Sequence, residues 1–210
     1  LLIWDLEHPL RFYYLLVKPQ WRSWLVRGGF IISGYGAVLA AHLAAGWLGR
    51  PELLKPLAIA GMPLAVMTAV YTAYLFAQAK ARDLWQSPLL PAHLAVQAVL
   101  AGSGVVLLAA TVVEPGAVRP LAWMFAGAGA VHLLMTLGEI TLTHGTAHAH
   151  LATLEMTRGK YARYFWISML LVLIGLAAPW IPIPAAVAGL LGLLAFEHAY
   201  VQAGQSVPLA

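Results

Sequence analysis

The sequence is 210 residues long, carries a formal net charge of +4, and is 61% hydrophobic but only 10% charged. An ordinary soluble domain has about 25% charged residues, so a soluble fold could not bury this much apolar surface. The charged residues gather in short clusters between long apolar runs, as is typical of loops beside membrane spans. These features predict an integral membrane protein and argue against a nucleic-acid-binding role.

Cysteine is absent from the sequence. The chain therefore cannot bind an iron–sulfur cluster through thiolates or form a disulfide, and any such cluster must lie in a partner. The sequence starts at Leu1 without a charged region followed by a cleavage site. We expect the natural chain to begin earlier, with one or more membrane spans before Leu1.

The first 16 residues are typical of the end of one helix, which breaks at Pro9 and leads into a basic, aromatic loop. Six long apolar segments follow and predict helices over 24–48, 53–79, 89–113, 118–143, 161–178 and 184–203. Most are long enough to cross a hydrocarbon core of about 30 Å at about 1.5 Å per residue, and the fifth is near the lower limit. The sequence thus predicts a single all-α transmembrane domain over 1–210.

The predicted loops alternate between two faces of the membrane, and basic residues divide unevenly between them. One face, here named the basic face, has Arg11, Lys18, Arg22, Arg27, Lys80, Arg82, Arg158, Lys160 and Arg163. The other face has Arg50, Lys55 and Arg119. This uneven division supports the helix count, because one missed span would scramble it. The excess of Lys and Arg in cytoplasmic loops would place the basic face in the cytoplasm.

Polar side chains inside the spans are the candidates for a functional site, because such groups are costly in lipid. Tyr71 and Tyr74 precede Arg82 by eleven and eight residues, or about 16 and 12 Å at about 1.5 Å per residue. His93 near the start of the third span and Glu139 near the end of the fourth also lie near the basic face. This distribution predicts one polar cavity that opens toward that face.

The fourth predicted helix carries a polar stripe. Its members are His132, Thr136, Glu139 and Thr143. Their spacing places them on one helix face, and a proton path along the stripe with Glu139 as carboxylate relay is one interpretation. A quinone site needs an apolar slot, a donor for each carbonyl oxygen and a group that exchanges protons. Tyrosine, histidine and carboxylate side chains in a membrane pocket meet these needs.

Several candidates also have purely structural interpretations. A tyrosine in a span commonly packs with its hydroxyl on a neighbouring carbonyl, and Asp5 and His8 are suited to capping a helix end. A further run of histidines comprises His144, His148 and His150. Their spacing resembles a metal site, but no cysteine or clear carboxylate partner is near, which favours solvated histidines. The expected interfacial belt consists of Trp21, Trp24, Trp47 and Trp85.

Three parts of the sequence carry recognisable patterns. Residues 5–12 read DLEHPLRF, residues 71–74 with 80–88 read YTAY and KARDLWQSP, and residues 159–166 read GKYARYFW. In this order and at these helix positions they resemble the NrfD and polysulfide-reductase membrane-subunit family, which includes membrane subunits of alternative complex III. Glu7 and His8 stand where that family has Gly-Arg.

The resemblance implies an eight-helix subunit that binds menaquinone or ubiquinone and carries no haem or iron–sulfur cluster. It implies electron exchange with a ferredoxin-like iron–sulfur subunit, connected to a molybdopterin or multihaem cytochrome catalytic subunit. It also implies the cytoplasmic membrane of a bacterium or archaeon. Tyr71 falls where the family places a quinone-contacting tyrosine. In the family, the surface near this tyrosine commonly meets an exported subunit, which is the side opposite to that indicated by the charge count.

The predicted site therefore has two parts. The quinone-binding candidates are Tyr71, Asp5, His8 and Arg11. The proton-relay candidates are Glu139, His132 and His93, and no residues are assigned to a metal. Whether the chain contributes to proton translocation, which quinone it uses and the direction of electron flow stay open.

Two other functions are alternatives. A b-type cytochrome anchor needs axial histidine pairs at matching depth on facing helices, and His42 and His93 lie toward opposite faces. A secondary transporter commonly has helices broken by Gly or Pro near the midplane in paired halves. Pro63 is one such interruption, but no matching partner is evident.

Overall fold

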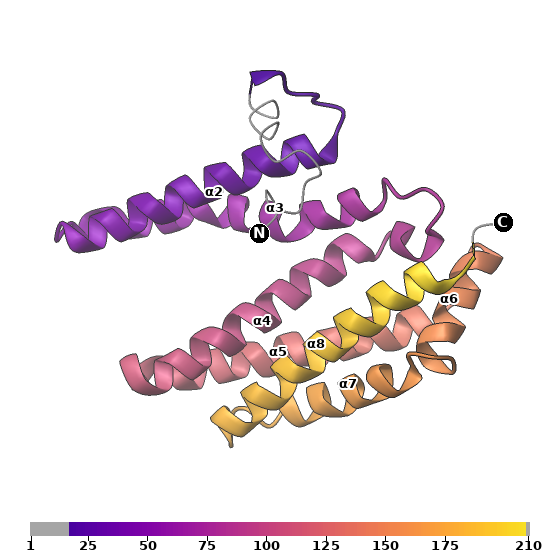
Figure 1. Ribbon diagram of the computed structural model, residues 1–210. Helices are drawn as coiled ribbons and strands as arrows, with labels where there is room; N and C mark the ends of the chain where they lie inside the picture. Colours follow the sequence, from indigo (N-terminus) through magenta and orange to yellow (C-terminus); the bar gives the residue numbers. More distant parts are fainter. Residues whose placement is uncertain (1–16, 209–210) are drawn as a thin grey trace. The chain divides into compact units, whose positions relative to one another are not determined.

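The computed structural model describes residues 17–208, and this part of the chain contains helices and no strands (Figure 1). The α-helices are α2 (Trp24–Trp47), α3 (Leu54–Phe76), α4 (Leu90–Val113), α5 (Val118–Thr141), α6 (Ala147–Thr157), α7 (Ala162–Gly175) and α8 (Pro182–Ser206). Short 3-10 turns precede three of them: η2 (Pro51–Leu53), η3 (Asp83–Gln86) and η4 (Pro115–Ala117). The predicted all-α fold is confirmed.

Five segments of the described chain are long and apolar enough to cross a membrane. They are Trp24–Trp47, Pro51–Phe76, Leu90–Val113, Pro115–Thr141 and Pro182–Ser206. Each coincides closely with a predicted span. The chain divides into two compact units, Leu1–Leu75 and Phe76–Ala210, which are described separately below. A single transmembrane domain stays a prediction.

The fifth predicted span is shorter than expected. Helix α7 has 14 residues, which is about 21 Å at about 1.5 Å per residue and less than the hydrocarbon thickness of about 30 Å. After Gly175 the backbone tightens, since the amide of Ala178 donates to the carbonyl of Gly175, and Pro179 then provides no amide donor. The chain therefore turns into α8 earlier than apolarity alone indicates.

Helix α6 was not predicted, although its sequence contains two helix signals. The side chain of Thr146 accepts a hydrogen bond from the amide of Ala149 at 3.2 Å, which caps the first turn. Buried residues then recur at helical spacing, at Ala149, Ala152 and Met156. This face packs against α8 and α7 and against η3, so tertiary contact stabilises a helix of only 11 residues.

In the unit 17–75, α2 and α3 form a hairpin. The turn uses Gly49, whose φ of +65° is the left-handed conformation that glycine adopts without strain. The rings of Trp24 and Tyr74 stack at 4.4 Å between centroids near the open end of the hairpin. Pro63 lies inside α3, and the helix continues through it.

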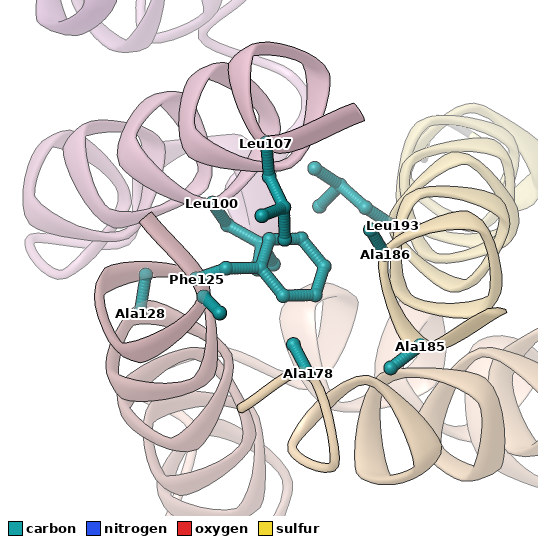
Figure 2. Close-up of a cluster of buried hydrophobic side chains, with 9 residues drawn as sticks. Leu100, Leu107, Phe125, Ala128, Ala178, Ala185, Ala186 and Leu193 are labelled. Atoms are coloured by element: carbon teal, nitrogen blue, oxygen red, sulfur yellow. The ribbon is translucent and has the colours of Figure 1, made fainter. Parts of the chain in front are cut away.

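The core of the unit 76–208 centres on Phe125 of α5. Its ring is surrounded by apolar side chains from α4, α5, α8 and the turn after α7 (Figure 2). Figure 2 labels Leu100, Leu107, Ala128, Ala178, Ala185, Ala186 and Leu193 around it. Gly104 of α4 and Gly189 of α8 make room for the ring, because a Cβ on either would lie within 3.0 Å of it. Small residues therefore allow these helices to approach closely.

The segment 80–88, part of the family resemblance, docks on the last turns of α8. The guanidinium of Arg82 donates to the carbonyl of Val207 at 2.8 Å, and the hydroxyl of Tyr200 donates to the carbonyl of Leu84 at 3.0 Å. The indole of Trp85 lies against Gly204 and is only 7% exposed. The expected membership of Trp85 in an interfacial belt is therefore wrong, because the ring packs inside this unit.

Candidate functional site

Three polar side chains of α4 and α5 meet inside the unit 76–208. Nε2 of His93 lies 2.8 Å from Nδ1 of His132, and both rings are at most 1% exposed. Nδ1 of His93 lies 3.5 Å from Oε2 of Glu139, whose side chain is 11% exposed. His93 is therefore the middle member of a chain of three titratable groups, here named the His–His–Glu relay.

Helical spacing explains why these groups meet. On α5, His132, Thr136 and Glu139 follow one another at i, i+4 and i+7, so they share a face. On α4, His93 and Gln97 are buried one turn apart. The two helices pack together, which brings the two polar faces into contact. Of these residues, Gln97 was missed by sequence reasoning, although its spacing of four from His93 was a usable signal.

The hydrogen bond between the two rings has a definite chemical meaning. In a neutral imidazole one ring nitrogen donates and the other accepts, so the proton between His93 and His132 sits on one of two facing nitrogens. If it sits on Nε2 of His93, then Nδ1 of His93 is free to accept a proton from Glu139. The three groups can therefore pass a proton along the line.

Several buried polar atoms around the relay have no hydrogen-bond partner among residues 17–208. They are Gln97 Oε1, His132 Nε2, Thr136 Oγ1 and Glu139 Oε1. Most buried polar atoms in proteins are paired, because an unpaired one costs about 1–3 kcal/mol. A cluster of such atoms is therefore better explained by a functional role than by stability.

Helix α8 closes the relay on another side. The Phe196 ring lies edge-on to His132 at 4.8 Å and tilted against His93 at 5.3 Å between centroids. Glu197, the next residue, is a second carboxylate within electrostatic range of His93. Sequence analysis assigned no role to Glu197.

A cavity of about 380 Å³ adjoins Glu139. Its walls are η3 with the following residues 87–89 on one side, and Glu139 of α5 with residues from the segment 142–149 on the other. Its polar lining consists of Asp83, Gln86, Ser87, Glu139, Thr143, His144 and Thr146. These loops belong to the predicted basic face, so the cavity lies where the sequence predicts a polar opening. Glu139 is thus the member of the relay that meets the cavity.

A comparison with known protein families finds a match over most of the sequence. Residues 1–199 match the family described as Polysulphide reductase, NrfD. The chain belongs to the NrfD family. No curated protein matches the sequence. This NrfD-family chain is a membrane subunit of a respiratory oxidoreductase. Its long apolar helices also indicate a multi-pass membrane protein.

Of the quinone-binding candidates in this NrfD-family chain, only Tyr71 lies in the described residues. Its ring lies directly over Gly28, where a side chain on Gly28 would collide with it. Within residues 17–208 its hydroxyl forms no hydrogen bond. Asp5, His8 and Arg11 lie outside the described residues.

The histidine run beside α6 is only partly solvated. Nε2 of His144 lies 2.8 Å from Oγ1 of Thr153, and the rings of His144 and His150 are 6.0 Å apart. Both ring nitrogens of His148 are buried, so the expectation of a solvated histidine is wrong there. Within the described part of the chain, no three His, Asp or Glu side chains are grouped to hold a metal ion.

Proposed function

We propose that this chain is the quinone-exchanging subunit of its complex, with the His–His–Glu relay handling the protons. Reduction of a quinone to a quinol consumes two electrons and two protons. The electrons would come from an iron–sulfur subunit, because this chain has no cysteine with which to hold a cluster. The observation that carries the proposal is the continuous line from the cavity through Glu139 and His93 to His132.

Each member of the relay has one task. Glu139, at the cavity, accepts a proton on its carboxylate and delivers it to Nδ1 of His93. His93 then gives the proton on Nε2 to Nδ1 of His132, and His132 would release the proton from its own Nε2, which has no protein partner among the described residues, to the reduced quinone. Both histidine rings are buried and covered by Phe196, so bulk water cannot exchange protons with them during the transfer. Oxidation of a quinol would use the same steps in reverse.

Tyr71 suits the quinone itself. A phenol can donate a hydrogen bond to a quinone carbonyl, and the contact with Gly28 fixes the ring of Tyr71 while its hydroxyl stays without a protein partner in the described residues. Asp5, His8 and Arg11 are proposed to complete the contacts. The quinone is menaquinone or ubiquinone, and the chain itself would bind no haem or iron–sulfur cluster.

The proposed partner is a ferredoxin-like iron–sulfur subunit docked at the membrane surface, which connects to a molybdopterin or multihaem cytochrome subunit. The proposed location is the cytoplasmic membrane of a bacterium or archaeon. A relay that is buried and polar along its length would also support proton translocation coupled to turnover. Proteins that co-purify with the chain in mild detergent would identify the partners.

The decisive experiment measures quinone kinetics of the intact complex with Glu139→Gln and Tyr71→Phe. Glu139→Gln keeps the size of the side chain but removes the transferable proton, so quinone turnover should fall about 100-fold or more, as for loss of a general acid–base group. Tyr71→Phe keeps the ring on Gly28 and removes the donor, so the apparent KM for quinone should rise.

Matched controls are available on the same chain. Glu114→Gln is the control for Glu139→Gln, because it changes an exposed carboxylate. Tyr74→Phe is the control for Tyr71→Phe: Tyr74 lies three residues after Tyr71, and the substitution keeps its ring stacked on Trp24. Both controls should have wild-type kinetics. Wild-type quinone kinetics in Glu139→Gln and Tyr71→Phe, with assembly intact, would remove the proposed roles.

A further inference from the structure

A second cavity, of about 660 Å³, lies between the end of α5 and α6 and is here named the α5–α6 cavity. Residues 140–144 form one wall, and α6 with its C-cap residue Arg158 forms the other. It shares Leu142, Thr143 and His144 with the cavity beside Glu139, but Glu139 does not line it. The α5–α6 cavity is therefore a separate site that the relay does not use.

The charge of the lining is uniform in sign. Arg158 and His150 contribute nitrogen donors, and no Asp or Glu lines the cavity. The Arg158 side chain is exposed and makes no ion pair within residues 17–208, so its five N–H donors are available. Arginine binds phosphate oxygens with paired, charge-assisted hydrogen bonds. The lining therefore fits an anion with several oxygen acceptors.

The orientation of His144 is fixed by its neighbour. The hydroxyl of Thr153 donates its only hydrogen to the carbonyl of Ala149 at 3.0 Å, so it accepts from Nε2 of His144 at 2.8 Å. His144 is thereby held in the wall of the cavity with a proton on Nε2.

The cavity lies at the level where a membrane span ends. Thr141 is the last residue of α5, a candidate span, and α6 begins only six residues later. Lys160 and Arg163, which follow α6, are also exposed. Basic residues directly beside a span are typical of contact with anionic lipid headgroups.

The rest of the lining is apolar. Ile140, Leu142 and Leu154 line the same cavity, and the side chain of Leu142 is 62% exposed. A volume of about 660 Å³ exceeds by far the roughly 30 Å³ that one water molecule occupies in the liquid. An inorganic anion would leave the apolar wall uncovered, whereas a lipid would cover it with glycerol and the start of an acyl chain.

We propose that the α5–α6 cavity binds the phosphate headgroup of an anionic phospholipid. Arg158 and His150 contact the phosphate oxygens, and Leu142 and Leu154 contact the apolar part of the lipid. Inorganic phosphate offers the same oxygens without the apolar part. The experiment therefore tests the phospholipid and inorganic phosphate each directly, to distinguish between them as the ligand.

The test uses the intact complex in phosphatidylcholine nanodiscs that contain spin-labelled phosphatidylglycerol. The measured quantity is the immobilised fraction of the label. Arg158→Gln should weaken binding about ten-fold, as for loss of a charge-assisted hydrogen bond, and His150→Gln should weaken it less. Arg158→Lys keeps the charge but not the paired donors and should fall between wild type and Arg158→Gln. Inorganic phosphate should not displace the lipid.

The matched control is Arg163→Gln, which removes one exposed charge near α6 without touching the cavity lining. It should leave binding unchanged. Equal weakening in Arg163→Gln and Arg158→Gln would mean a diffuse surface charge and overturn the proposal. Unchanged binding in both Arg158→Gln and His150→Gln would also overturn it, as would displacement by inorganic phosphate. Wild-type quinone turnover in Arg158→Gln would show that the variant is folded.

Discussion

His93 and His132 are hydrogen-bonded ring to ring, with 2.8 Å between Nε2 and Nδ1, and neither side chain is more than 1% exposed. The two residues come from different helices and are 39 positions apart in the sequence. The pair joins the polar faces of α4 and α5 and gives Glu139 its partner. The contribution of this pair can be measured through protein stability and through the visible spectrum of the complex.

His132→Leu should destabilise the protein by about 1–3 kcal/mol. The substitution fills the space with an apolar side chain but leaves Nε2 of His93 buried and without a partner. The measurement is thermal or denaturant unfolding of the purified subunit in detergent. His198→Leu, at an exposed position of α8, is the control and should have a much smaller effect. Equal stability of the wild type and His132→Leu would contradict the assigned hydrogen bond.

The same pair makes a prediction about the visible spectrum. A metal–nitrogen bond is itself about 2 Å long, so two nitrogens 2.8 Å apart cannot bind opposite sides of one iron atom. We expect that His132→Leu leaves the reduced-minus-oxidised spectrum of the complex unchanged. Loss of a Soret band in that variant would favour the b-type cytochrome alternative instead.

Gly189→Ala should destabilise the unit 76–208 by about 1–3 kcal/mol, the usual cost of overpacking. A Cβ at this position would lie 2.6 Å from Cζ of Phe125, and that ring is 1% exposed and enclosed on all sides by the core. Gly127→Ala is the matched control, since a Cβ there meets no atom within 4 Å. Unfolding in detergent should show that Gly189→Ala is clearly less stable than Gly127→Ala. Similar stabilities of the two variants would contradict the packing of α5 on α8.

Tyr200→Phe should cost about 1 kcal/mol of stability. It removes the hydroxyl that donates to the carbonyl of Leu84 at 3.0 Å and leaves that buried acceptor unpaired. Tyr164→Phe loses a hydroxyl from a side chain that is 48% exposed and should be nearly neutral. Limited proteolysis of the segment 80–88 gives a second measurement, because this segment should open more often only in Tyr200→Phe. Equal cleavage in both variants would show that Tyr200 does not fix the segment.

Much of the relay could be anticipated along a single helix. The spacing of His132 and Glu139 on α5 follows from 3.6 residues per turn, and their cost in lipid marks them as exceptional. Their contact with His93 did not follow, because it depends on which face of α4 meets α5. Helix α4 is apolar on nearly every side, so no amphipathic stripe identifies the face that packs on α5.

The sequence by itself determined that this protein lies in lipid and that its membrane segments are helices. Long apolar segments can satisfy their backbone groups in lipid only as helices, and this local requirement needs no knowledge of neighbours. Only the tertiary structure decided that His93 meets His132, that Trp85 is buried and that α6 forms. Each of these depends on close packing between segments distant in the chain, where small residues such as Gly104 and Gly189 set how near two helices approach.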